Sequence, residues 1–113
     1  MKNQYIVILV TAKNKNQAKK IAQSLLKDQL VACVNIVGGI ESYFRWDGKL
    51  DHSKEVLLII KSKQNMFEKI VSKVKSLHSY ENPEIIALPI VAGSTAYLQW
   101  IDESISGTSG GIL

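Results

Sequence analysis

Three short segments of this chain are apolar at almost every position, and they limit the fold more than any other feature of the sequence. They are 5–10 (YIVILV), 56–60 (VLLII) and 85–91 (IIALPIV). Each is short for a helix, and the set is rich in β-branched residues, which is typical of β-strands. A strand with one wetted face alternates apolar and polar residues, so these segments predict strands that are covered on both faces.

The segments that follow two of these strands have helical periodicity. Residues 14–30 and 64–78 each place apolar side chains three and four positions apart, with lysines on much of the remaining surface. This pattern predicts two helices that bury one face each. Asn14 or Asn16 is expected to cap the first helix. A short last element over 95–104 is also predicted to be helical.

A long β-hairpin is predicted in the middle of the chain. Asp47-Gly48 lies between two extended runs, and this dipeptide favours a tight turn in which both residues adopt positive φ. The arms run over 31–46 and 49–61, and Gly38-Gly39 predicts a bulge or bend in the first arm. Strands usually have about 5–6 residues. We therefore expect the hairpin to project beyond its own sheet and to pair with a neighbouring molecule.

The element order β-α-β-β-α-β is that of the ferredoxin-like α+β fold. In this fold both helices lie on one face of an antiparallel sheet, and the other face is open. Here the strands are apolar on that side too, and soluble monomers expose apolar patches of only about 300–600 Å². The sequence therefore predicts that the open face packs against further copies of the chain.

Length and cysteine content limit the domain organisation. The chain has 113 residues and one cysteine, so we expect a single domain over 1–105, no internal disulfide and a loose Gly/Ser/Thr tail over 106–113. A core of this size folds without a stabilising metal. The apolar run 5–10 is too short to span a membrane and lacks a cleavage-site pattern. These features predict a cytoplasmic protein with no membrane partner.

The positive charge of the chain does not indicate a nucleic-acid partner. The formal net charge is +4, but Arg45 is the only arginine among 14 basic residues. Nucleic-acid readers rely on arginine for bidentate contacts, and RNA-binding domains of this topology stack bases on aromatic residues of their central strands. Residues 56–60 contain no aromatic residue. The lysines are better explained as a solvated surface, with an anion-attracting face as the alternative.

Five segments resemble one known family. They are LVACVN (30–35), SYFRWDGK (42–49), EVLLIIK (55–61), HSYENPEI (78–85) and YLQWI (97–101). In this order and spacing they resemble the CutA-type divalent-cation tolerance proteins. The resemblance implies a tight homotrimer of ferredoxin-like subunits, similar in architecture to the PII signalling proteins. It also implies a role in tolerance to copper and other divalent metals, with Cu²⁺ or another divalent cation as the bound ion.

The chain departs from the common pattern of this family in two places. The loop at 11–14 lacks a proline that is common there, and Ser79 replaces the proline of a His-Pro-Tyr-Glu motif. Some members carry a cysteine at the end of the first strand and a pair of histidines before the tyrosine, where this chain has Val10 and Leu77-His78. A copper site built in that way is therefore incomplete in this chain.

The candidate metal ligands are few and scattered. A strong transition-metal site needs about three or four convergent ligands, and Cys33, His52 and His78 form no local pair. Cys33 is expected to be a small buried side chain, and His52 a solvated one. His78, at the end of a predicted helix, either interacts with the helix dipole or joins Glu81 in a site. We name His78, Glu81 and Cys33 as metal candidates, in a site that other subunits would complete, either as three copies of one ligand around an axis or as a cleft shared by two chains.

The candidate ligand-binding residues are assigned to a cleft between subunits. They are Lys61, His78, Tyr80, Glu81 and Trp46. The alternative functions of these residues are a solvated strand end for Lys61 and an interface anchor for Trp46. No Ser-His-Asp or Cys-His arrangement is visible, so we expect no enzyme, with a shared His78/Glu81 acid–base pair as the remaining catalytic hypothesis. A small-anion-binding, PII-like signalling or scaffolding trimer is the alternative function.

Overall fold

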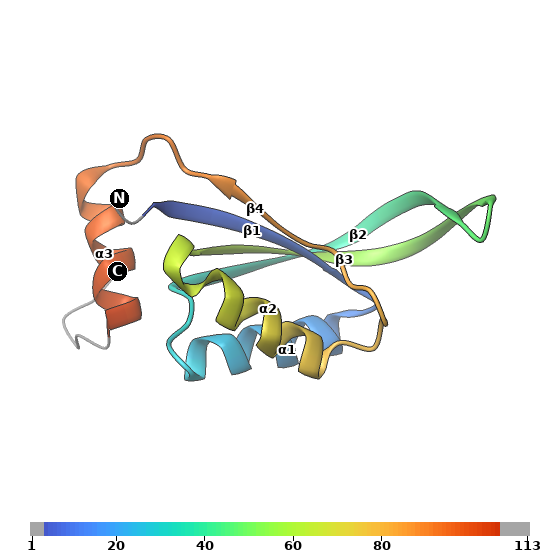
Figure 1. The fold of residues 1–113 in the computed structure, drawn as a ribbon, viewed down its shortest axis with the longest axis horizontal. Coiled ribbons are helices and arrows are strands. Elements are labelled where there is room, and N and C mark those ends of the chain that lie inside the picture. The colour runs from blue at the N-terminus through green and yellow to red at the C-terminus, as the bar shows by residue number, and fades with distance from the viewer. Residues whose placement is uncertain (1–3, 107–113) are drawn as a thin grey trace.

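A computed structural model describes residues 4–106, which form one four-stranded sheet and three α-helices (Figure 1). The elements are β1 (Tyr5–Ala12), α1 (Lys15–Lys27), β2 (Cys33–Trp46), β3 (Lys49–Lys63), the 3-10 turn η1 (Gln64–Met66), α2 (Phe67–Leu77), β4 (Ile85–Pro89) and α3 (Thr95–Ser106). The strand order is β2-β3-β1-β4 and every pair is antiparallel. This is the predicted ferredoxin-like α+β arrangement.

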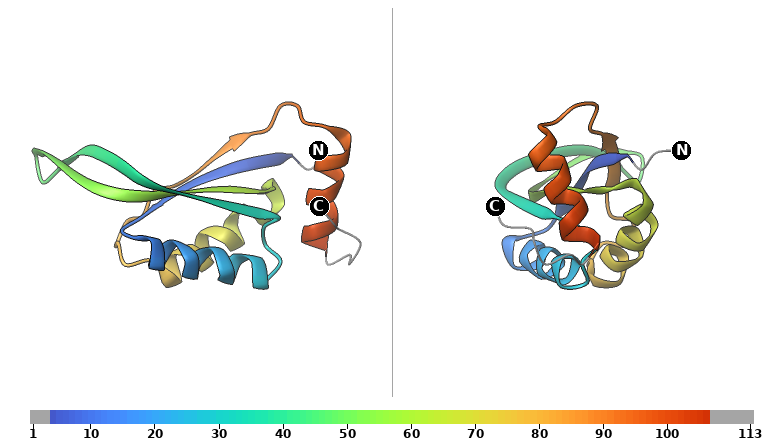
Figure 2. Two further views of the ribbon diagram at one scale, coloured as in Figure 1. Left: turned by 180° about the vertical axis from the view of Figure 1, so that it is seen from behind. Right: turned by 90° about the vertical axis from the view of Figure 1, so that its left-hand side faces the viewer.

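Helices α1 and α2 cover one face of the sheet, as Figures 1 and 2 show. Asn14 caps α1, because its Oδ1 accepts a hydrogen bond from the Gln17 N–H at 2.9 Å. Helix α1 buries four side chains at helical spacing, and α2 buries Ile70 and Val74. These pack on the alternate residues of β1 and β3 that point to this side. The fully buried centre contains Ile8, Ile21, Leu25, Leu58, Ile60, Ile70 and Val74.

The opposite face of the sheet is apolar, and within residues 4–106 only α3, at one end, covers any of it. Along β1 the residues that alternate with the buried Ile6, Ile8 and Val10 are only half-buried. The register places them beside matching residues of the neighbouring strands. This open face contains Val7 and Leu9 of β1, Leu57 and Ile59 of β3, Val37 of β2, and Ile86 and Leu88 of β4. Ile86 and Leu88 keep about half of their surface exposed, at 49% and 50%.

The β2–β3 hairpin extends well beyond the helices (Figure 1). Its arms have 14 and 15 residues, and the turn residues Asp47 and Gly48 have φ values of 54° and 76°. The register shifts between Val37 and Ile40, and Gly39 has a φ of 76° there, so the predicted bulge is present. The bulge marks the point where the hairpin leaves the body of the sheet.

Helix α3 lies across the end of the sheet that is remote from the hairpin turn (Figures 1 and 2). Its Ile101 and Ile105 form a small cluster with Ala32. Asp102 joins it to the sheet by an ion pair with Lys63 at 2.7 Å and a hydrogen bond from the Tyr5 hydroxyl at 2.6 Å. The helix continues to Ser106, the first residue of the predicted tail 106–113, and the rest of that tail lies outside the described residues.

No helix within residues 4–106 is both long and apolar enough to cross a membrane.

Candidate functional site

His78 connects the end of α2 to the end of β1. Its Nε2 lies 2.7 Å from the Thr11 carbonyl oxygen, and its Nδ1 accepts a hydrogen bond from the Tyr80 N–H at 3.0 Å. The carbonyl oxygen can only accept a hydrogen bond, so Nε2 carries the proton. Nδ1 is then unprotonated, and its lone pair accepts the hydrogen bond from the Tyr80 N–H. Both ring nitrogens are therefore engaged within the chain. A metal at His78 would have to displace one of these two bonds.

Tyr80 extends this connection to β3. Its hydroxyl donates a hydrogen bond of 2.8 Å to Oε2 of Glu55, a residue that is only 8% exposed. Burial, followed by the hydrogen bond and the negative charge of Glu55, raises the pKa of Tyr80 to about 12, against a smaller opposing effect of Ser53. The phenol therefore stays protonated at neutral pH and remains a hydrogen-bond donor.

Sequence reasoning missed Glu55 and Thr11. The signal for Glu55 was an acidic residue immediately before the apolar run 56–60, a position where a carboxylate is rarely buried without a partner. Thr11 contributes only its backbone carbonyl, so its residue type carried no signal. The resulting cluster of Thr11, Glu55, His78 and Tyr80 is called the loop anchor below.

A second polar group lies on the open face near α3. Cys33 of β2 is directly opposite Lys61 of β3, and the Lys61 ammonium donates a hydrogen bond to the Asn35 side-chain carbonyl. Burial, followed by the neighbouring Cys33 thiol, raises the pKa of Tyr97 from α3. Cys33 is half-buried. This group, Cys33, Asn35, Lys61 and Tyr97, is called the thiol–lysine group.

The predicted site residues therefore lie in separate places on one chain. The register pairs Val7 with Lys61, so Thr11 of the loop anchor lies four residues along β1 from the level of the thiol–lysine group, about 13 Å at strand rise, and Glu55 lies six residues from Lys61 along β3. Trp46 is at the hairpin turn and is 67% exposed, and Glu81 is an exposed loop residue. Within residues 4–106 no three His, Cys, Asp or Glu side chains converge as a metal site. Within residues 4–106, a single chain brings together two pairs of the predicted residues, His78 with Tyr80 and Cys33 with Lys61.

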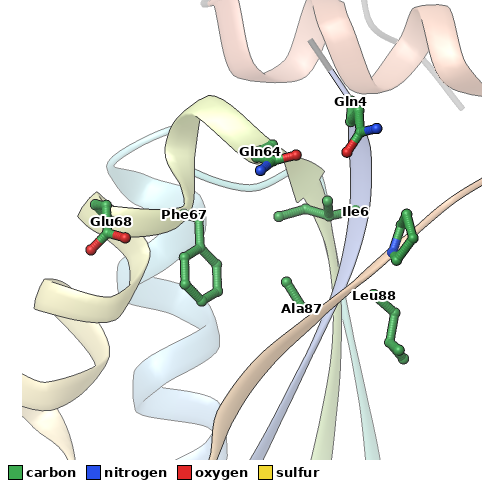
Figure 3. Close-up of a pocket in the computed structure, with 8 residues that line it drawn as sticks. Gln4, Ile6, Gln64, Phe67, Glu68, Ala87 and Leu88 are labelled. Atoms are coloured by element: carbon green, nitrogen blue, oxygen red, sulfur yellow. The ribbon is translucent and has the colours of Figure 1, made fainter.

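A groove of about 430 Å³ lies between the start of α2 and β4, on the helix side of the sheet (Figure 3). Its lining contains none of the predicted site residues. It is formed by Gln4, Ile6, Gln64, Phe67, Glu68, Ala87, Leu88 and Pro89. The groove therefore combines an apolar floor with amide and carboxylate groups.

The sequence matches the family model described as CutA1 divalent ion tolerance protein over residues 6–104. The divalent-cation tolerance protein CutA of Thermus thermophilus is 43% identical over 98 residues, which cover 87% of this chain and 95% of that protein. The chloroplastic CutA protein of Arabidopsis thaliana is 48% identical over 99 residues, 88% of this chain and 54% of that protein. The chain thus spans about half the length of the plant relatives that it matches.

Solved structures share the fold. CutA1 from Oryza sativa superimposes with a TM-score of 0.87 at 44% identity, covering 89% of this chain and 93% of that chain. A periplasmic divalent cation tolerance protein CutA from Archaeoglobus fulgidus gives a TM-score of 0.87 at 40% identity, covering 89% and 98%.

The cytoplasmic location that we predicted from the single cysteine and the short apolar run 5–10 is wrong. Relatives with the same fold are named chloroplastic in Arabidopsis and periplasmic in Archaeoglobus. One cysteine cannot form an internal disulfide in any compartment, so its presence does not distinguish a reducing from an oxidising one.

The element order and the five sequence segments are thus matched by a family model over 6–104 and by solved structures with the same fold. The predicted resemblance is confirmed, and the relatives are named for tolerance of divalent cations and not for a reaction. This chain belongs to the CutA1 divalent ion tolerance family.

Proposed function

We propose that this protein is a homotrimer that serves divalent-cation tolerance and takes its ligand, copper or another divalent cation, at the boundary between subunits. The observation that carries the proposal is the open face of the sheet. A row of apolar side chains from all four strands lies there, covered within residues 4–106 only by α3 at one end. Burial of such a face against further copies is favourable at about 25 cal/mol per Å².

The strand order supports the same assembly. β2 and β4 are the two edges of the sheet, and each has one side without a partner strand in residues 4–106. If the β2 edge of one copy binds the β4 edge of the next, each copy is rotated relative to its neighbour. The copies then form a ring when these rotations add up to a full turn. The projecting part of β2 is the element with the reach to meet β4 of a neighbour. The number three comes from the family resemblance.

Assembly changes which residues meet. The thiol–lysine group lies on the open face and would face a neighbouring subunit, and Glu81 is exposed in the loop that follows α2. A ligand site would then use side chains from two chains, which explains why the metal candidates His78, Glu81 and Cys33 do not converge in one. Folding itself needs no cofactor, because the buried centre is aliphatic.

A small anion is the second candidate ligand, as in a PII-like signalling or scaffolding trimer. The specific observation in its favour is that both nitrogens of His78 are engaged, whereas Lys61 presents an ammonium group on the open face. No catalytic step, nucleic acid or membrane is part of either candidate.

Native mass spectrometry of the purified protein tests the proposal, with and without one equivalent of Cu²⁺ per chain. We expect a trimer that retains copper, with the metal lost in His78→Ala and kept in the control His52→Ala, which removes an exposed hairpin histidine. Weak copper uptake that is equal in both variants, together with phosphate binding that Lys61→Ala abolishes, would favour the anion. A monomer at all concentrations would refute the assembly.

A further inference from the structure

The positive charge of the chain is concentrated on the two helices that cover the sheet. Residues 13–30 and 64–77 carry eight lysines and two acidic residues, a net charge of +6, although the whole chain has only +4. The other residues therefore have a net charge of −2. Helices α1 and α2 lie side by side, on the side of the sheet opposite the open face (Figure 2). Their outer surface stays accessible in the proposed assembly, and its charge attracts anions.

One part of this surface is hollowed. An open hollow of about 280 Å³ lies along α2 beside the end of α1, and it is lined by Leu30, Lys69, Ser72, Lys73 and Ser76. The four residues of α2 have the i, i+3, i+4, i+7 spacing that forms one stripe on a helix. Pockets for drug-sized ligands have about 300–1,000 Å³, so this α1–α2 hollow suits a small ionic group.

The polar lining of the α1–α2 hollow consists of ammonium and hydroxyl groups. Lys69 forms no ion pair within residues 4–106, and the hydroxyl of Ser72 makes no hydrogen bond with any of them. Ser76 differs, because its hydroxyl already donates a hydrogen bond of 2.7 Å to the Lys73 carbonyl oxygen. The hollow thus offers two ammonium groups and one free hydroxyl to a ligand. A terminal phosphate, with up to two negative charges and three acceptor oxygens, matches these donors better than a carboxylate does.

Asp28, which caps the end of α1, competes with such a ligand. Its Oδ2 lies 2.7 Å from Nζ of Lys73. The two side chains are 41% and 33% exposed, and ion pairs this accessible to water are weak. An ammonium group also has three donors, so Lys73 can bind a second oxygen or exchange partners.

We infer that the α1–α2 hollow binds a phosphate group, held by the ammonium groups of Lys69 and Lys73 and the hydroxyl of Ser72. The phosphate belongs to a soluble compound or to a lipid headgroup, which share this chemistry. This site is on the outer surface of a single chain. It is therefore independent of the proposed cleft between subunits and of the oligomeric state.

Isothermal titration calorimetry of the intact protein at low salt tests the site, with inorganic pyrophosphate as the probe. Lys69→Ala/Lys73→Ala should weaken binding about tenfold, because two charged contacts are lost. Lys15→Ala/Lys19→Ala is the matched control, since it removes the same charge at the same spacing from α1, outside the hollow. The control should weaken binding by less than about twofold, because more distant charges are screened.

Removal of the competing carboxylate should have the opposite effect. Asp28→Asn frees Lys73 and should strengthen pyrophosphate binding about threefold. Glu68→Gln makes the same charge change at the start of α2, outside the lining of the hollow, and should leave the affinity nearly unchanged. Equal effects of the two members of either matched pair would mean that the lysines attract anions only diffusely, and would overturn the site.

Vesicle sedimentation separates the two sources of the phosphate. Phosphatidylcholine vesicles are compared with and without phosphatidic acid, whose headgroup is a phosphate monoester. Binding that requires phosphatidic acid and is lost in Lys69→Ala/Lys73→Ala assigns the hollow to a lipid headgroup. Pyrophosphate binding without vesicle binding assigns it to a soluble phosphate compound. If the original protein binds neither probe, the inference is wrong, whatever the oligomeric state of the protein.

Discussion

The hydroxyl oxygen of Tyr80 lies 2.8 Å from Oε2 of Glu55, and this bond joins the loop after α2 to the strand that forms the hairpin. The same loop is joined to β1 through His78 and the Thr11 carbonyl. The loop anchor therefore ties three elements together at the base of the hairpin. A histidine that sequence reasoning grouped with metal ligands makes, in the chain itself, two structural hydrogen bonds.

Loss of the Tyr80 hydroxyl should destabilise the fold. Tyr80→Phe leaves Glu55, a residue that is 8% exposed, without the partner it has in the native structure. An unsatisfied buried acceptor costs about 1–3 kcal/mol in free energy of unfolding. Denaturant unfolding at one fixed protein concentration measures the change, because the proposed assembly would make stability depend on concentration. Tyr43→Phe, at an exposed tyrosine, is the control; equal losses in the two variants would count against the loop anchor.

The same phenol should make stability sensitive to alkaline pH. The folded pKa of Tyr80 is raised from 10.0 to about 12 by burial and by Glu55. A raised folded pKa contributes stability that is complete below the unfolded value and is lost as pH rises from about 10 through about 12. Tyr80→Phe should therefore have a flatter stability profile over this window than the original protein. Unfolding measured at several alkaline pH values checks this, and parallel profiles for the two proteins would refute it.

Short-range sequence signals, such as capping, turn and bulge residues, predicted the helices and strands of this fold well. They predicted the contacts between those elements less well. Asn14, Asp47-Gly48 and the bulge at Gly39 act within a few residues of themselves, so their signals are complete in the sequence. The partnership of Glu55 with Tyr80 spans 25 residues and depends on how a loop folds back on the sheet. No spacing rule encodes such a pair.

The ligand candidates failed to converge for a related reason. His78, Glu81 and Cys33 were grouped as metal candidates by residue type alone. In the structure His78 contacts Thr11 of β1, whereas Cys33 pairs with Lys61, at the level of Val7 and four residues from Thr11 along β1. The groove beside β4 was not foreseen at all. It is formed by ordinary residues from β1, η1, α2 and β4, which meet only when the sheet order is known.

The hairpin should depend on glycine at its turn and tolerate alanine at Gly38 beside its bulge. Gly48 has a φ of 76°, which an L-residue adopts at a cost of about 1–2 kcal/mol, so Gly48→Ala should lower the free energy of unfolding by about that amount. Gly38→Ala is the matched control. An added Cβ there would lie 2.9 Å from Cε of Lys15, the movable end of a long side chain. Denaturant unfolding compares the two, and an equal or larger cost at Gly38 would contradict this account of the turn.

A charge on the open face should prevent assembly without unfolding the subunit. Ile59 lies at the centre of that face, beside Leu9 of β1 and Asn35 of β2, and it points away from the helices. Ile59→Glu places a carboxylate where the proposed trimer has no water, and an unpaired charge buried at an interface is strongly unfavourable. We expect a monomer by light scattering, with a circular dichroism spectrum close to that of the original protein. Ser76→Glu, on the exposed surface of α2, adds the same charge and should remain a trimer. A trimer in both Ile59→Glu and the double variant Ile59→Glu/Lys61→Ala, which removes the ammonium group next to Asn35, would mean that the subunits meet elsewhere.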